Sequence, residues 1–298
     1  MEQPDRARDP PRDHTRSGPS LTAERVAAFR AAESMLPVDQ RVCYDPYAIQ
    51  FTDPDRLDDL TEYTDTHFPG LRNYVVARAR HFDDVITLAA KTGLVQLVIL
   101  GAGYDTRPYR IKELEGRVRV FEVDHPDTQQ VKKEKIAEIF GGLPEDVVYV
   151  PVDLETQDLG SLLLDSGYFP VKKTLFVMEG VIMYLTPRAI DAILSFVVNN
   201  SGQNSAVLFD YPEETGDDTD SSSRKTREDF GKHTARHGEP ILFSMPKEGP
   251  GAFLRARGFS RIRIVPGDDY RRLYFIRKKE GRELLTTSSF VYAVVGDR

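Results

Sequence analysis

Two glycines at the end of a short apolar run are the first residues of this chain that suggest ligand chemistry. Residues 97–100 form the run, and Gly101 and Gly103 follow it directly. Such a run is typical of a strand buried on both faces of a parallel sheet. Glycines beyond its carboxyl end would let a nucleotide-like ligand lie against the main chain. Position 106 is Thr106, where a dinucleotide-binding fingerprint has its third glycine, so a pyrophosphate site is disfavoured.

Acidic residues follow three further apolar runs. The second run ends in Glu122 and Asp124, the third is followed by Asp153, and the fourth is followed by Glu179. An acid in such a place can accept hydrogen bonds from ribose hydroxyls or an adenine amino group, although it can also cap the next helix. Because the carboxyl ends of parallel strands meet at one edge, the recurrence of these acids there favours a ligand site.

The order of these motifs resembles the leucine carboxyl methyltransferase-like family of S-adenosylmethionine-dependent methyltransferases, in particular its bacterial O-methyltransferase branch. The resemblance spans residues 21–298 and is carried by DPYA (45–48), LGAGYDTRPYR (100–110), FEVDHP (121–126), PVDL (151–154) and EGVIMYL (179–185). It implies a Rossmann-like α/β fold and S-adenosylmethionine as methyl donor. It also implies that the cofactor is bound by Gly101, Asp124, Asp153, Leu154 and Glu179, and the glycine turn adds Gly103 to the expected cofactor residues.

Arg78 stands out independently of these motifs. Residues 71–90 have the periodicity of a helix with one apolar face, and Arg78 lies in the middle of that face, whereas Arg80 and Asp83 lie off it and are expected to face solvent. A lone buried arginine needs an anionic partner, because an isolated buried charge is very costly. The partner is either a carboxylate of the sheet or the carboxylate of the cofactor's methionine part. The resemblance also places an arginine here, so we favour the cofactor.

Composition limits the classes of function. The chain has 298 residues and a formal charge of −7, without a basic block in its folded part, so nucleic-acid binding has little electrostatic support. No apolar run of membrane-spanning length is present. Cys43 is the only cysteine, which excludes an internal disulfide and favours a reducing, cytoplasmic environment. His233 and His237 have a metal-like spacing, but their polar surroundings favour a solvated helix face, and we expect no metal.

We expect a doubly wound, mostly parallel seven-stranded sheet with an antiparallel edge strand in one methyltransferase domain, residues 21–298. Residues 1–20 are polar and proline-rich and predict a disordered tail, and residues 21–70 predict a helical cap. The polar segment 212–245 is a candidate lid over the site, or else an exposed loop. Three terminal runs, 261–266, 272–277 and 288–296, would finish the sheet with antiparallel pairing.

No residue is identified as a catalytic base. Tyr104, Arg107, Tyr184 and Tyr211 are candidates for positioning a methyl acceptor, although each fits a packing role equally well. A carboxylate, with a pKa of about 4, is ionised at neutral pH and needs no base, whereas a phenol, with a pKa of about 10, would benefit from one. We therefore expect O-methylation of a small molecule, at a carboxylate or else a hydroxyl.

Two rival classes stay open. A nicotinamide-dependent oxidoreductase or epimerase would use the same strand and glycine turn, but it would ordinarily carry the third glycine and a Tyr-x-x-x-Lys pair. The residue four positions after Tyr184 is Arg188, so that pair is missing there. The other rival is a cofactor-binding regulator that has lost its activity, which the residues alone do not exclude.

Overall fold

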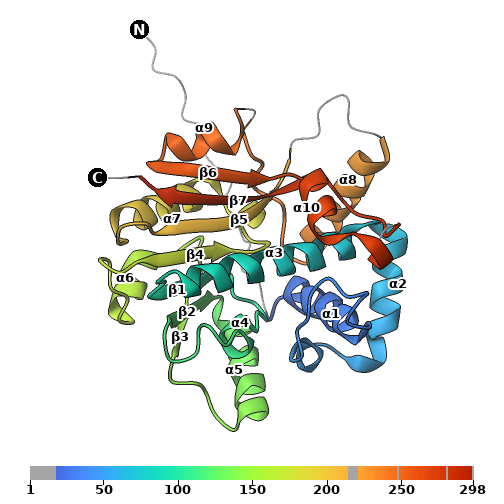
Figure 1. The fold of residues 1–298 in the computed structure, drawn as a ribbon, viewed down its shortest axis with the longest axis horizontal. Helices are drawn as coiled ribbons and strands as arrows, with labels where there is room; N and C mark the ends of the chain where they lie inside the picture. Colours follow the sequence, from blue (N-terminus) through green and yellow to red (C-terminus); the bar gives the residue numbers. More distant parts are fainter. Residues whose placement is uncertain (1–17, 214–220, 247, 280, 297–298) are drawn as a thin grey trace.

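The computed structural model describes residues 18–213, 221–246, 248–279 and 281–296, and these build one twisted sheet (Figure 1). Its strand order is β3-β2-β1-β4-β5-β7-β6. The strands are β1 (Gln96–Leu100), β2 (Arg119–Asp124), β3 (Val147–Pro151), β4 (Thr174–Met178), β5 (Ala206–Pro212), β6 (Phe259–Val265) and β7 (Ser288–Val295). β1 to β5 are parallel, and β7 runs antiparallel to both β5 and β6. This confirms the predicted Rossmann-like sheet with antiparallel pairing towards one edge.

Helices cover both faces of the sheet and one of its ends. They are α1 (Leu21–Met35), α2 (Leu57–His67), α3 (Leu71–Lys91), α4 (Arg107–Arg110), α5 (Pro126–Phe140), α6 (Leu159–Asp165), α7 (Pro187–Asn199), α8 (Ser221–Arg236), α9 (Gly249–Arg255) and α10 (Gly267–Tyr274), with the short 3-10 turns η1 (Ala48–Phe51), η2 (Pro54–Arg56), η3 (Ile182–Tyr184) and η4 (Arg277–Lys279). No helix among the residues described is both long and apolar enough to cross a membrane.

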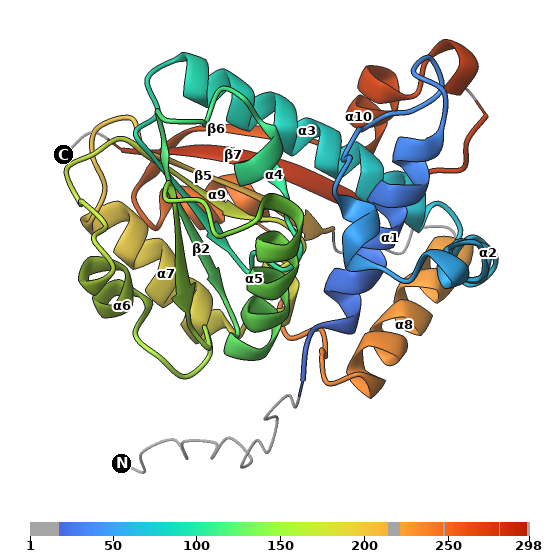
Figure 2. The ribbon, with the colours of Figure 1, turned by 90° about the horizontal axis from the view of Figure 1, so that it is seen from below.

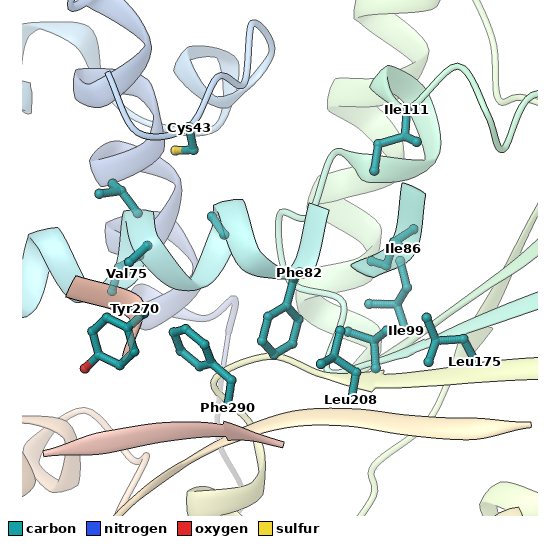
Figure 3. Close-up of a cluster of buried hydrophobic side chains, with 14 of the residues drawn as sticks. Cys43, Val75, Phe82, Ile86, Ile99, Ile111, Leu175, Leu208, Tyr270 and Phe290 are labelled. Atoms are coloured by element: carbon teal, nitrogen blue, oxygen red, sulfur yellow. The ribbon is translucent and has the colours of Figure 1, made fainter. Parts of the chain in front are cut away.

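The alternation of side chains along β1 divides the core into two layers. Ile99 faces α3 and packs in one cluster with Phe82 and Ile86, as Figure 3 shows, whereas Val98 and Leu100 belong to the cluster on the other face with α6, α7 and α9. α3 and α7 lie on opposite sides of the sheet (Figure 2). Burial on both faces explains why β1 reads as an unbroken apolar run.

A cap of helices stands beyond the carboxyl ends of the parallel strands. α1, α2, α8 and α10 gather at that end of the sheet (Figures 1 and 2). Ser20 caps α1, because its Oγ accepts a hydrogen bond from the backbone N–H of Ala23 at 3.0 Å. Ala23 in turn faces the glycine turn, because a Cβ added at Gly103 would lie 3.2 Å from its Cβ. Residues 1–17 of the predicted tail lie outside the described residues.

The expected strand at 272–277 is wrong, because α10 and the turn after it occupy this segment. Pro266 precedes the helix, and Asp268 and Asp269 in its first turn complement the helix dipole. The apolar residues that suggested a strand are in part exposed, with Leu273 51% and Ile276 49% exposed. Their alternation therefore did not report a buried face.

Candidate functional site

A cavity of about 940 Å³ lies between the carboxyl ends of the strands and the helical cap. Its volume is at the upper end of the range for small-molecule sites, about 300–1,000 Å³. The structure brings all of the predicted cofactor residues to its wall. These are Arg78, Gly101, Gly103, Asp124, Asp153, Leu154 and Glu179.

The glycine turn after β1 leaves bare main chain on the cavity wall. Gly101 has φ +64°, and a Cβ there would lie only 2.4 Å from Cγ2 of Val181. The backbone N–H of Gly103 donates to Oδ2 of Asp124, which ties the turn to the end of β2. The turn is thus a cradle that a side chain would fill, and this fits a nucleoside cofactor lying against the backbone.

Asp124 and Asp153 supply acceptors at the ends of two neighbouring strands. Oδ1 of Asp124 accepts from the N–H of His125 at 2.6 Å. Asp153 accepts from Oγ1 of Thr156 at 2.7 Å and from the N–H of Glu155 at 3.0 Å, which closes a local turn. Both residues line the cavity, so these acceptors fit the hydroxyl donors of a ribose and the amino group of an adenine.

Glu122, the other acid at the end of the second run, does not line the cavity. Its carboxylate is fully buried, with Oε1 2.8 Å from Nζ of Lys132 on α5. Tyr109 donates to the same oxygen at 2.9 Å. Burial raises the pKa of Glu122 to about 7 against the attraction of Lys132. Glu122 is therefore a core group, and the expectation that it offers an acceptor to ribose is wrong.

Arg78 has two carboxylate partners on the sheet. Its Nη1 lies 2.8 Å from Oδ2 of Asp210, and its Nε lies 3.1 Å from Oε1 of Glu179. Tyr74 and the N–H of Gly180 also donate to Asp210, each at 2.6 Å. Burial alone would lower the pKa of Arg78, but the two carboxylates raise it. Arg78 thus pairs with carboxylates of the sheet, which is one of the two partners considered for it. The residue also lines the cavity.

Arg107 forms ion pairs with three carboxylates of the protein. Its Nε lies 2.7 Å from Oδ1 of Asp83, and its Nη1 lies 2.7 Å from Asp105 and 2.5 Å from Oε2 of Glu179. Burial would raise the pKa of Asp105, but Arg107 outweighs it and holds that pKa at about 2. Arg107 therefore fixes Glu179 in place. Asp83, expected to face solvent, is instead paired with Arg107 and Arg110, because α4 packs against that side of α3.

The three candidate tyrosines differ in whether they line the cavity. Tyr104 lines the cavity and stacks on Phe51, with ring centroids 5.0 Å apart. Tyr184 also lines it, and burial raises the pKa of its hydroxyl above the ordinary value. Tyr211 is absent from the lining residues and packs beside Phe209, and burial raises its pKa to about 12. Two of the three tyrosines thus line the cavity.

The part of the cavity under the cap is mostly apolar. The lining side chains there include Val26, Phe29, Phe68, Leu71, Met183, Phe230, Ile241, Leu242 and Leu285. Phe230 comes from α8, so an exposed loop is wrong for residues 221–236 of the candidate lid segment. The carbonyl of Met183 accepts from the N–H groups of Leu242 and Phe243 at 2.8 and 3.1 Å, which fastens the segment beyond α8 to η3. Residues 214–220 of the segment lie outside the described residues.

The histidine pair of α8 is only in part solvated. His237 is exposed, as expected, but the ring of His233 packs against Phe68, with centroids 5.6 Å apart. Its Nε2 is buried without a hydrogen-bond partner, and burial lowers its pKa to about 4. Within the described residues, no group of three or more His, Cys, Asp or Glu side chains could hold a metal ion.

Sequence reasoning missed three residues of the site. Asp210 was the detectable one, because it interrupts the apolar run of β5. Arg25 follows the start of α1 and lines the cavity next to Val26. Glu239 accepts from Ser20 at 2.7 Å and from Thr22, although more than 200 residues separate them. No local pattern reports such a distant contact.

Comparison with known proteins agrees with this geometry. The family model described as leucine carboxyl methyltransferase matches residues 23–198. The Bacillus subtilis protein named "Putative S-adenosyl-L-methionine-dependent methyltransferase YktD" is 32% identical over 219 residues, which cover 74% of this chain and 71% of that protein. A Mycolicibacterium smegmatis protein of the same general name is 31% identical over 242 residues, covering 76% and 78%.

A solved structure described as a "putative methyltransferase" from Thermobifida fusca covers 97% of this chain and 99% of its own, with a TM-score of 0.62 at 13% identity. At that identity the likeness shows the fold alone, and the family follows from the sequence matches. The chain therefore belongs to the leucine carboxyl methyltransferase family, a family of S-adenosylmethionine-dependent methyltransferases.

Proposed function

We propose that this protein transfers the methyl group of S-adenosylmethionine to a carboxylate of a small molecule. The observation that carries the proposal is that one cavity has the glycines and acids of the strand ends on one wall and mostly apolar side chains under the cap. Glu179 is held by two arginines, and burial raises the pKa of Tyr184. Neither group is suited to remove a proton, which favours an acceptor that is already ionised.

The residues of the strand ends would hold the cofactor. Asp124 would accept from the ribose hydroxyls, and Asp153 with Leu154 would hold the adenine. Gly101 and Gly103 would lie against the nucleoside and methionine parts. Arg78 and Glu179 would bind the charged end of the methionine part, with Arg78 shared between its sheet partners and the ligand carboxylate. These assignments rest on the position of each side chain on the cavity wall.

The chemistry needs alignment rather than a covalent intermediate. The sulfonium supplies an electrophilic methyl group; the C–S bond breaks as a C–O bond forms, so that an ester and neutral S-adenosylhomocysteine result. The ionised acceptor gives up no proton. The chain's part is to hold donor and acceptor in line and to exclude water, which can supply most of the acceleration in such displacements. The apolar side chains of the cap suit this task.

Two experiments test the proposal. Calorimetry should show binding of S-adenosylmethionine and S-adenosylhomocysteine. A higher affinity for NADH than for either of these compounds would favour the oxidoreductase alternative. Small carboxylic acids and phenols are then screened with methyl-labelled cofactor, and the products are treated with mild base. Methyl esters hydrolyse and aryl methyl ethers do not, so base-stable label in every product would refute the carboxylate. Cofactor binding without any turnover would support the regulator alternative.

A further inference from the structure

The arginines on the wall of the cavity differ in whether they have a charge partner within the protein. Arg30 is paired with Asp45 at 2.9 Å, and Arg78 and Arg107 share Glu179. Arg188 is exposed at the rim. Arg25 alone is in part buried and, within the described residues, has neither an ion pair nor a hydrogen-bond partner for its Nε.

Arg25 lies on the part of the cavity wall under the cap, where most of the lining side chains are apolar. Val26 and Phe29 on the same helix and Phe68 at the end of α2 line the cavity with Arg25, and so do Tyr184 and Glu239. Burial lowers the pKa of Arg25, and the electrostatic influence of Tyr184 and Glu239 only partly opposes this. The Nε of Arg25 is buried without a hydrogen-bond partner. An N–H group withdrawn from water in this way is costly, and the cost is recovered when an anion accepts from it.

Glu239 does not serve as that anion. One of its oxygens accepts from Ser20 and the other from Thr22, so the carboxylate is directed to the start of α1. This contact fastens the segment after α8 to the helix that carries Arg25. The guanidinium is thus presented from a helix that is fixed at its first turn, as a recognition group should be.

We propose that Arg25 binds the carboxylate of the methyl acceptor and that the acceptor is an acid with an apolar body, which Phe29, Phe68 and Phe230 receive. The proposal rests on the proposed function and names its substrate class. A planar guanidinium matches a carboxylate, and the match is lost when methylation turns that carboxylate into a neutral ester. Arg25 thus selects the acid for binding and disfavours the product, which assists its release.

The test compares acids with their neutral amides in protein saturated with S-adenosylhomocysteine. Calorimetry measures the binding of benzoate, phenylacetate and hexanoate, and of the three matching amides, to the wild type and to Arg25→Gln. We expect the wild type to prefer at least one acid over its amide, and the variant to lose that preference by about 10- to 150-fold, the range for a hydrogen bond to a charged group. Arg188→Gln, at the exposed rim, is the matched control and should keep the preference.

Each remaining outcome overturns the proposal in a distinct way. If the wild type prefers no acid, or if Arg188→Gln loses the preference instead, Arg25 is not the recognition group. If Arg25→Gln weakens S-adenosylhomocysteine binding as much as acid binding, Arg25 belongs to the cofactor site. Arg25→Met should reproduce Arg25→Gln, which separates loss of charge from a misfolded variant. Failure of the wild type to bind S-adenosylhomocysteine at all would refute the proposed function itself.

Discussion

Replacing Arg78 by methionine should destabilise the protein strongly, because it leaves a buried carboxylate without its cation. Asp210 is fully buried, and in Arg78→Met it would keep only the neutral donors Tyr74 and Gly180. Removing one member of a buried ion pair costs about 3–5 kcal/mol, and methionine retains most of the packing of the arginine stem. For a chain of this size, such a loss lowers Tm by on the order of 10 °C.

Urea unfolding monitored by circular dichroism measures this loss without ligand. Arg80→Met is the matched control, because Arg80 lies on the same helix and makes an exposed pair with Asp84 at 2.9 Å. That pair should contribute less than about 1 kcal/mol. A double-mutant cycle with Asp210→Asn should give a coupling of about 0.5–3 kcal/mol between Arg78 and Asp210. If Arg78→Met proves as stable as Arg80→Met, the buried network does not support the fold and the reasoning is refuted.

The same variant tests the ligand role of Arg78. At 25 °C, under conditions where Arg78→Met is still folded, we expect it to bind S-adenosylmethionine less tightly by about 2–5 kcal/mol, or about 30- to 5,000-fold. Loss of stability together with unchanged cofactor affinity would show that Arg78 acts only within the sheet network. Unchanged stability together with weak cofactor binding would show the reverse.

Three further predictions concern other parts of the molecule. Gly101→Ala should weaken cofactor binding and lower the free energy of unfolding by about 1–3 kcal/mol, measured by calorimetry and urea unfolding, because its Cβ would meet Val181 at a strained φ. Arg25→Met should raise Tm without ligand by about 2–4 °C, by removing an unpaired, partly buried charge; an unchanged or lower Tm would contradict that account. The pKa of Glu122 is raised to about 7 in the folded protein, so between pH of about 4.5 and 7 the folded state binds more protons than the unfolded state. The stability that protonated Glu122 contributes is therefore lost as pH rises through this range. Urea unfolding at pH 5 and pH 8 should therefore show a smaller decline with pH in Glu122→Gln than in the wild type, and equal declines would refute the assignment.

Local patterns in the chain were enough to predict the parts of the fold that obey a simple period. The apolar runs that became β1, β4 and β5 are buried throughout, whereas β3 at the edge is only partly buried. The glycine turn follows β1 because only glycine tolerates that close approach to Val181. The burial of Arg78 also follows from the helical period of α3. For the same reason, the acids at the strand ends could be placed on one edge before any contact was known.

The periodicity of a helix or strand does not identify the partner of a buried charge. The amphipathic pattern of α3 shows that Arg78 is buried, but not that Asp210 and Glu179 meet it from two different strands. It misplaced Asp83, whose partners are on α4. The alternation at 272–277 suggested a strand where acidic residues in the first turn favour a helix. For Arg78 and Asp83 the deciding contacts join residues of different elements.

The chamber under the cap is the clearest case of a feature that only the tertiary structure decided. α1, the residues around Phe68 and α8 are each amphipathic or polar segments with no motif, and their sequences do not report that they enclose one space with Arg25 on its wall. The sequence by itself determined the apolar runs of the parallel strands, the family motifs and the edge on which the candidate cofactor residues lie, because these depend on residues close together along the chain. The acceptor side depends on how distant helices pack, since burial and the lack of a charge partner for Arg25 exist only once those helices are in place.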